Sequence, residues 1–234
     1  MGQSINEFKL ISETFTSSAS STITQEVRHI HLERNIIVTK EDLLLFKKLN
    51  KEQLTAYDAI FDRIFSNGSR VFFIDGLGGT GKSFLYRALL AMVRSRGFIA
   101  LAITTSSFAT FVLPGGRTAH SRFKLSIDTS RNYSCNISKQ SSLASLIRDA
   151  KLIVWDEVSM AKKKLVETFD LLLRDIMDKD TLFGGKVVVF GGDFRQTLPV
   201  KGKPFSIWIC VPKVMAGILQ AVREDEEEIC VAQS

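Results

Sequence analysis

Residues 76–83 read Gly-Leu-Gly-Gly-Thr-Gly-Lys-Ser, so four glycines stand just before a cationic side chain and a hydroxyl. The run matches the pattern G-x-x-x-x-G-K-[ST] at every fixed position. Glycines let a backbone wrap closely around an anion, and the N–H groups at the start of a following helix point at it. The pattern therefore predicts a loop that binds the phosphates of a nucleoside triphosphate. Its predicted contacts are Gly76, Gly78, Gly79, Thr80, Gly81, Lys82 and Ser83.

The two residues at the end of this loop have separate expected roles. Lys82 is expected to reach the β and γ phosphates of ATP, and the Ser83 hydroxyl is expected to bind Mg²⁺. The alternative is a chance glycine-rich turn. At ordinary glycine frequencies the four fixed positions coincide on the order of once per hundred chains of this length.

Two adjacent carboxylates, Asp156 and Glu157, follow an apolar run at residues 152–155. Like charges at the buried end of a strand are costly unless a cation lies beside them. We predict that Asp156 binds Mg²⁺ and that Glu157 polarises the attacking water as a general base. The alternative is a solvated acidic pair at the start of a helix.

Two glutamines are candidates for contacts at either end of the nucleotide. Gln196 follows Gly191, Gly192 and Asp193 after the apolar run 187–190, where its amide is placed to sense the γ phosphate. Gln53 precedes the phosphate loop, and a glutamine amide can donate to and accept from adenine at once. For Gln53 the alternative is an exposed residue at a helix start.

Short apolar runs alternate with amphipathic segments along the chain. We expect strands at 71–74, 99–103, 152–155 and 187–190, and helices at 50–65, 82–96, 143–149 and 162–177. This alternation predicts an α/β fold, with a parallel sheet covered by helices on both faces. Ligands of such sheets bind at the carboxyl ends of the strands, and the polar motifs stand there.

The length of 234 residues suits one substantial domain. We expect a poorly patterned, partly flexible segment at 1–40, the phosphate-loop domain at 41–202 and an acidic tail at 203–234. No apolar run approaches the ~18 residues of a membrane span, and no secretory signal begins the chain. We therefore expect no membrane partner and no secretion. The net charge of +6 is compatible with nucleic acid without requiring it.

Five stretches together resemble the Pif-type (petite-integration-frequency) DNA helicases of superfamily one, particularly the plant group related to Helitron transposon helicases. They are LNKEQLTAYDAIF (49–61), VFFIDGLGGTGKSFLYRALL (71–90), LPGGRTAHSRFKL (113–125), CNISKQSSLASLIRDAKLIVWDEVSM (135–160) and FGGKVVVFGGDFRQTLPV (183–200).

The resemblance implies a RecA-like P-loop NTPase domain that uses ATP and Mg²⁺ for 5′-to-3′ DNA unwinding. It implies single-stranded DNA or DNA junctions as partners, work in DNA repair, recombination and telomere maintenance, and a nuclear or alternatively mitochondrial location. It carries adenine recognition to Gln53 and γ-phosphate sensing to Gln196. The residues it places toward DNA are Thr105, Ser106, Arg117, His120, Arg122 and Phe123.

Within that set we expect the arginines to bind the DNA backbone and Phe123 to stack on a base. The alternative is a solvated basic loop. A second RecA-like domain is expected to be absent or truncated, because 38 residues follow Gln196 (234 minus 196), whereas a domain needs about 100 or more. We expect the isolated chain to bind nucleotide, hydrolyse it slowly and not unwind DNA. The alternative from another class is a truncated ATP- or DNA-binding module. A kinase or GTPase is disfavoured, since no N-K-x-D run is present.

Overall fold

The computed structural model of the chain describes residues 31–66, 68, 70–125 and 137–193. The longer helices are α3 (Lys51–Phe65), α4 (Lys82–Ser95), α6 (Ser142–Asp149) and α7 (Lys163–Met177), and two short ones are α2 (Lys40–Leu44) and α5 (Ala119–Phe123). The strands are β1 (Arg70–Asp75), β2 (Ile99–Thr104), β3 (Arg117–Thr118), β4 (Ala150–Asp156) and β5 (Val187–Gly192). Single 3-10 turns are η2 (Leu45–Lys48), η3 (Phe108–Phe111), η4 (Val158–Met160) and η5 (Leu182–Gly185).

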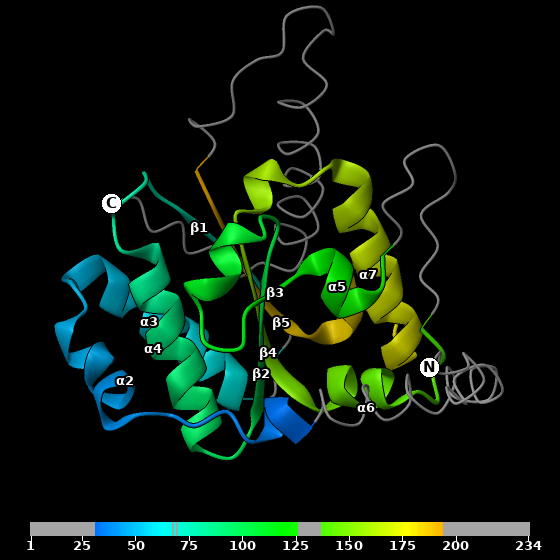
Figure 1. The fold of residues 1–234 in the computed structure, drawn as a ribbon, viewed down its shortest axis with the longest axis horizontal. Helices are drawn as coiled ribbons and strands as arrows, with labels where there is room; N and C mark the ends of the chain where they lie inside the picture. Colours follow the sequence, from blue (N-terminus) through cyan, green and yellow to red (C-terminus); the bar gives the residue numbers. More distant parts are fainter. Residues whose placement is uncertain (1–30, 67, 69, 126–136, 194–234) are drawn as a thin grey trace, which may run out of the picture.

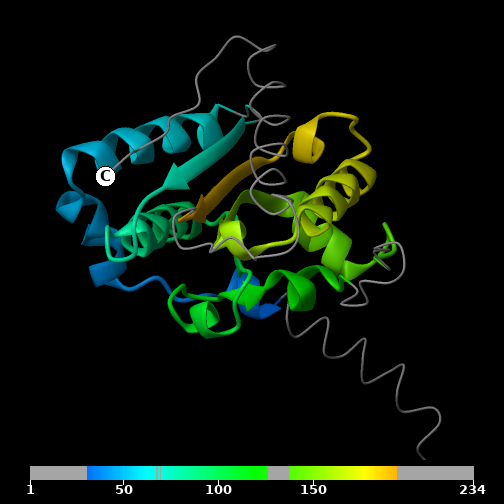
Figure 2. The ribbon, with the colours of Figure 1, turned by 90° about the horizontal axis from the view of Figure 1, so that it is seen from above.

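The five strands form one sheet in the order β1-β5-β4-β2-β3, and every neighbouring pair is parallel. Figure 2 shows β1 and β5 side by side and pointing the same way. The parallel arrangement brings the carboxyl ends of β1, β5, β4 and β2 to one edge. The phosphate loop, the acidic pair and the loop after β2 all begin at that edge.

Helices cover both faces of the sheet, with α3 and α4 on one side and α5, α6 and α7 on the other (Figure 1). Alternate strand residues enter the two cores. Phe72 and Val154 pack toward α3 and α4, whereas Phe73 and Trp155 pack toward the opposite layer. The predicted α/β fold with a doubly covered parallel sheet is therefore confirmed.

Local signals explain where the helices begin and end. Asn50 caps α3 through a reciprocal capping box with Gln53, because each side chain accepts a hydrogen bond from the other residue's backbone N–H. Helix α7 buries one face, as its apolar spacing predicts, and ends at Asp178 in a left-handed conformation. Among the described residues, no helix is long and apolar enough to cross a membrane.

The segment before residue 41 contributes to this domain more than its unpatterned sequence indicates. Residues 31–38 run along the domain, and the side chain of Glu33 is buried there. The Ile36 side chain lies so close to Gly115 that a Cβ on the glycine would approach it to 2.5 Å. A single buried carboxylate such as Glu33 leaves no periodic pattern, so the sequence does not reveal that residues 31–38 pack against the domain. The predicted boundary at residues 202 and 203 lies outside the described residues.

Candidate functional site

The phosphate loop joins the carboxyl end of β1 to the first turn of α4. Gly79 and Gly81 have φ values of +86° and +87°, which glycine adopts without strain. Gly81 caps α4, and a Cβ there would lie 2.7 Å from Nε2 of Gln53. The backbone conformation therefore favours glycine at position 81, and a side chain there would also displace the Gln53 amide. The positive end of the α4 dipole faces the edge where the strands end, as an anion site requires.

Lys82 and Ser83 occupy the first two positions of α4. The Lys82 ammonium donates to the carbonyl oxygens of Gly76 at 2.5 Å and Leu77 at 3.1 Å. The Thr80 hydroxyl donates to the same Leu77 oxygen at 2.9 Å. These bonds hold the loop in a closed curve. The ammonium thus lies directly over the loop, where phosphate oxygens can replace the carbonyls as its acceptors.

Gln53 lies against the phosphate loop, in contrast to the alternative of an exposed helix-start residue. Its Oε1 accepts from the backbone N–H of Asn50 at 3.1 Å, and its Nε2 donates to the Thr80 carbonyl at 3.1 Å. An amide carries two donors and two acceptor positions, so each end retains capacity for one further bond. The structure brings Gln53 to the loop, and its contact with adenine stays a prediction.

Asp156 ends β4 as a buried carboxylate with 4% of its surface exposed. Its Oδ1 accepts from the backbone N–H of Glu157 at 2.9 Å. Burial, and after it the charge of Glu157, raises the pKa of the Asp156 carboxyl to about 6, although the Glu157 N–H and the Lys82 ammonium oppose the rise. The charged form of the Asp156 carboxyl is therefore disfavoured here, because nearby positive charge does not fully compensate it.

Glu157 has a left-handed backbone, with φ +56° and ψ +36°, which is uncommon for a residue with a side chain. Such conformations cost on the order of 1–3 kcal/mol and collect at functional sites. Asp156 stays buried at the strand end, while Glu157 is partly exposed.

These side chains fit a magnesium–nucleotide complex. Mg²⁺ usually takes one or two protein carboxylates together with phosphate and water oxygens, rather than a cage built from protein alone. Asp156 supplies a buried carboxylate that lacks positive charge, and Ser83 supplies a hydroxyl beside Lys82. The described part of the chain contains no group of three or more His, Cys, Asp or Glu side chains able to hold a metal ion.

Two of the residues predicted to face DNA lie at the same edge, directly beside the acidic pair. The Thr105 backbone N–H donates to the Asp156 carbonyl at 3.3 Å, and its hydroxyl accepts from Nε1 of Trp155 at 3.0 Å. The Ser106 N–H donates to the Thr104 hydroxyl at 3.3 Å. The sequence places Trp155 only within the expected apolar strand at 152–155. Its indole N–H instead connects the acidic strand end to the loop after β2.

Arg122 and Phe123, which the family resemblance places toward DNA, are buried in this structure. Phe123 is 0% exposed, and its ring centroid lies 4.8 Å from that of Phe169 on α7. Arg122 is 3% exposed and donates to Oε1 of Glu33 at 2.6 Å and to the Gly115 carbonyl at 2.9 Å. Helix α5 turns both side chains inward, so neither reaches a nucleic acid in this conformation.

Arg117 and His120, the other two predicted DNA contacts, are partly exposed. Nε of Arg117 lies 3.9 Å from Oε1 of Glu33. Burial lowers the pKa of Arg94 to about 10, and the Glu33 charge opposes that fall. Glu33 therefore balances several guanidinium groups around the loop 113–123. Nothing in the local sequence marks Glu33 for this role, because its hydrogen-bond partner Arg122 is 89 positions away. Gln196 lies outside the described residues.

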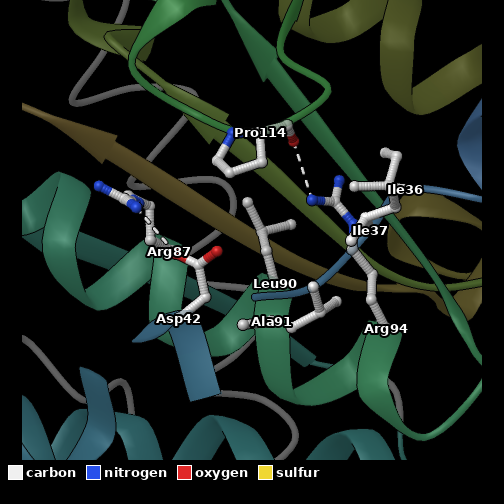
Figure 3. A pocket seen from close by; sticks show the side chains of 9 residues that line it. Ile36, Ile37, Asp42, Arg87, Leu90, Ala91, Arg94 and Pro114 are labelled. Atoms are coloured by element: carbon white, nitrogen blue, oxygen red, sulfur yellow. Dashed lines mark hydrogen bonds and ion pairs between the residues drawn. The ribbon is translucent and has the colours of Figure 1, made fainter. Parts of the chain in front are cut away.

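A pocket lies between residues 36–38 and α4 (Figure 3), and no residue of the phosphate loop 76–83 lines it. Arg87 pairs there with Asp42 at 2.7 Å, and Arg94 donates to the Pro114 carbonyl at 2.8 Å. Its remaining lining is largely apolar. Because these contacts already engage both arginines, we interpret this pocket as a packing defect between two segments rather than a ligand site.

Residues 48–212 match the family described as PIF1-like helicase. The chain is 33% identical over 165 residues to the ATP-dependent DNA helicase Pif1 of Campylobacter jejuni, which covers 67% of the chain and 32% of that protein. A Pif1 helicase structure from Candida albicans superposes with a TM-score of 0.58 at 22% identity, over 80% of this chain and 40% of that one. A Bacteroides Pif1 structure bound to single-stranded DNA gives 0.53 at 26% identity, over 69% and 35%.

The chain thus spans about a third of the length of the Campylobacter relative. The matched region includes the phosphate loop, the acidic pair and the loop after β2, and the described part folds as one RecA-like domain. The sequence match and the fold agree, and this chain belongs to the PIF1-like helicase family.

Proposed function

We propose that the chain binds ATP with Mg²⁺ and acts as the first motor domain of an ATP-dependent DNA helicase. The observation that carries this proposal is that the phosphate loop after β1 and the acidic pair Asp156 and Glu157 after β4 lie at the same edge of the sheet, on the two strands that flank β5. The electrostatic influence of Lys82 on Asp156 reflects the proximity of the two motifs. The plant and Helitron-like branch of the family is supported by the motif strings named above.

Each residue has one task in this proposal. The loop N–H groups and Lys82 hold the β and γ phosphates, while Ser83 and Asp156 hold Mg²⁺. Glu157 accepts a proton from the attacking water, and Gln196 senses the γ phosphate. Gln53 hydrogen-bonds adenine, and its bond to the Thr80 carbonyl connects this contact to the phosphate loop. Bound Mg²⁺ neutralises charge that builds on the phosphate oxygens during transfer.

Single-stranded DNA or a DNA junction is the proposed partner at the carboxyl edge of the sheet. Thr105 and Ser106 lie on the loop after β2, Arg117 lies on β3 and His120 lies on α5. All four side chains are partly exposed. The Bacteroides relative binds single-stranded DNA, which supports the same class of ligand here. We also propose 5′-to-3′ polarity, tasks in DNA repair, recombination or telomere maintenance, and a nuclear or mitochondrial location, on the family resemblance.

A second candidate is an ATP- and DNA-binding module with little turnover. The chain spans about a third of the Campylobacter helicase, and the described residues form one RecA-like domain. In related NTPases an arginine supplied from outside the phosphate-loop core speeds hydrolysis by about 10³–10⁵. We therefore expect the isolated chain to bind nucleotide well and to hydrolyse it slowly, without unwinding.

Phosphate release measured with and without single-stranded DNA separates the two candidates. The first candidate predicts slow turnover that DNA stimulates, and that Lys82→Ala and Glu157→Gln both abolish. Glu157→Gln should retain nucleotide binding, because the amide has the same shape as the carboxylate. It should lose turnover, because the amide cannot act as the base. Binding without any turnover in the unaltered chain would favour the module. Processive strand separation by the isolated chain would refute the expectation of no unwinding.

A further inference from the structure

Tyr86 is a buried polar residue that the proposed chemistry leaves unused. It lies on α4, three positions after Ser83, and is 0% exposed. Among the described residues its hydroxyl has no hydrogen-bond partner. A buried hydroxyl without a partner is costly, so such a group needs an explanation.

The Tyr86 hydroxyl is directed at the middle of the candidate site. It lies against Gly191 on β5, where an added Cβ would fall only 1.8 Å from the hydroxyl oxygen. Gly191 follows Phe190, which pairs with Trp155 on β4, and the next residue along β4 is Asp156. Neighbouring strands are about 4.8 Å apart. The hydroxyl therefore lies at the level of the Asp156 strand end.

The charges around the hydroxyl keep its proton in place. Burial, followed by the charges of Asp156 and Glu157, raises the pKa of Tyr86 well above its usual range. The phenol is accordingly a neutral hydrogen-bond donor close to two carboxylates. Asp156 is buried and already accepts one bond at Oδ1 from the Glu157 N–H. A carboxylate has room for several more donors.

We propose that Tyr86 is a positioning residue for the metal-binding carboxylate. When the magnesium–nucleotide complex is bound, its hydroxyl donates a hydrogen bond to Asp156 and fixes the direction in which that carboxylate presents its other oxygen. Partners of this kind, behind a metal ligand, orient the ligand and tune its affinity. Gly191 belongs to the same arrangement, because only glycine leaves space for the hydroxyl. This inference rests on the proposed function and assigns one more residue to that site.

The chain offers a matched control in Tyr57. This tyrosine is also buried, and its hydroxyl also lacks a hydrogen-bond partner among the described residues. Its ring stacks on Phe61 at 6.0 Å, and burial raises its pKa to about 12. The charges that act on it are those of Arg96 and Asp58, not the acidic pair. Tyr57→Phe therefore removes an equivalent hydroxyl from outside the proposed metal site.

The test compares Tyr86→Phe and Tyr57→Phe with the unaltered chain in titrations with Mg²⁺·ATP and with ATP in EDTA. Tyr86→Phe should bind Mg²⁺·ATP about tenfold more weakly, the value of one hydrogen bond to a charged group. It should bind metal-free ATP as the unaltered chain does, and unfold at the same or a higher temperature without nucleotide. Tyr57→Phe should change neither affinity. Equal Mg²⁺·ATP affinity in Tyr86→Phe and the unaltered chain overturns the proposal.

A second measurement needs no substitution at Tyr86. The chain has three tyrosines, so labelling them with ¹³C at Cζ gives three resonances. The Tyr86 resonance, the one unaffected by Tyr57→Phe and Tyr133→Phe, should shift with Mg²⁺·ATP and not with metal-free ATP. If the Tyr86 resonance shows no Mg²⁺-specific shift, the proposed role of Tyr86 is overturned. No binding of Mg²⁺·ATP by the unaltered chain instead overturns the proposed function, and this inference with it.

Discussion

At the scale of single residues, the site is organised around a carboxylate in an unfavourable environment. Asp156 is buried next to Glu157, and both burial and the Glu157 charge raise its pKa. The Lys82 ammonium opposes this rise, but its effect is smaller than either. A bound cation would lower the free energy of the charged form of this carboxylate. The same uncompensated carboxylate therefore lowers the stability of the unliganded domain and favours the binding of Mg²⁺.

Asp156→Asn should stabilise the nucleotide-free domain at neutral pH. The folded pKa of about 6 lies above the ordinary value of 3.8, so the folded state holds this proton more tightly. The contribution of Asp156 to stability is accordingly full below pH ~4 and is lost as pH rises through ~6, a loss of about 3 kcal/mol.

Thermal unfolding in EDTA between pH 5 and pH 8 measures this effect. The unfolding temperature of Asp156→Asn should exceed that of the unaltered chain at pH 8, and the difference should shrink toward pH 5. Excess Mg²⁺·ATP should stabilise the unaltered chain and not the variant. A difference that does not depend on pH would contradict the electrostatic account.

At the scale of elements, the segment 31–38 and the packing of α4 on β5 determine how the loops are held. Glu33 is the buried ion-pair partner of Arg122, and the end of the Tyr86 side chain on α4 packs against Gly191 on β5. Both contacts join parts of the chain that are distant in sequence. Each gives a stability prediction with a control in the same neighbourhood.

Glu33→Ala should destabilise the domain by about 3–5 kcal/mol, because it leaves the Arg122 guanidinium buried without its charge partner. The control is Arg34→Ala, which removes the neighbouring Arg34–Asp149 pair, whose side chains are 51% and 46% exposed. Exposed pairs of that kind contribute about 0–1 kcal/mol. Urea unfolding of both variants compares them, and similar losses in the two would argue against a structural role for Glu33.

Gly191→Ala should destabilise the fold by more than Gly97→Ala. The new methyl group at position 191 would lie 1.8 Å from the Tyr86 oxygen, so the ring or the strand must move. At Gly97, with φ +78°, nothing lies within 4 Å, and only the left-handed backbone opposes alanine, at about 1–2 kcal/mol. If calorimetric unfolding ranked the two variants the other way round, the packing of α4 on β5 would be misassigned.

The sequence was sufficient to predict the elements that carry the chemistry. Buried parallel strands are continuous apolar runs, so the ends of β1, β4 and β5, and the motifs after them, could be located from local pattern. The expected strand at 152–155 is β4 (Ala150–Asp156), and the helix expected at 162–177 is α7 (Lys163–Met177).

Contacts between distant segments were not predictable in this way. Arg122 and Phe123 looked like a basic, aromatic DNA-facing loop, but Glu33 and Phe169 draw them into the interior. Tyr86 carries no local signal of a role at the site, since its hydroxyl acquires its surroundings only when β5 lies beside it. Nothing in the local spacing of either segment encodes those partners.

At the scale of the whole molecule, the described RecA-like domain brings the proposed nucleotide site next to the edge that we propose for DNA. The hydrogen bond from Trp155 to Thr105 connects the two, since Trp155 directly precedes Asp156. Trp155→Phe preserves an aromatic ring against Phe169 and removes the indole donor. We expect this variant to keep its affinity for Mg²⁺·ATP and to lose stimulation of ATP turnover by single-stranded DNA. Unchanged stimulation would show that the bond serves packing alone.

The central claim is that a magnesium–triphosphate complex binds at the loop 76–83 opposite Asp156. Calorimetric titration of the folded chain with Mg²⁺·ATP, beside Lys82→Ala, tests it most directly. The account predicts saturable binding with one site per chain, weakened at least tenfold by Lys82→Ala, which loses a charge-assisted contact to the phosphates. Folded chain that shows no binding, or equal binding by the variant, would contradict the account.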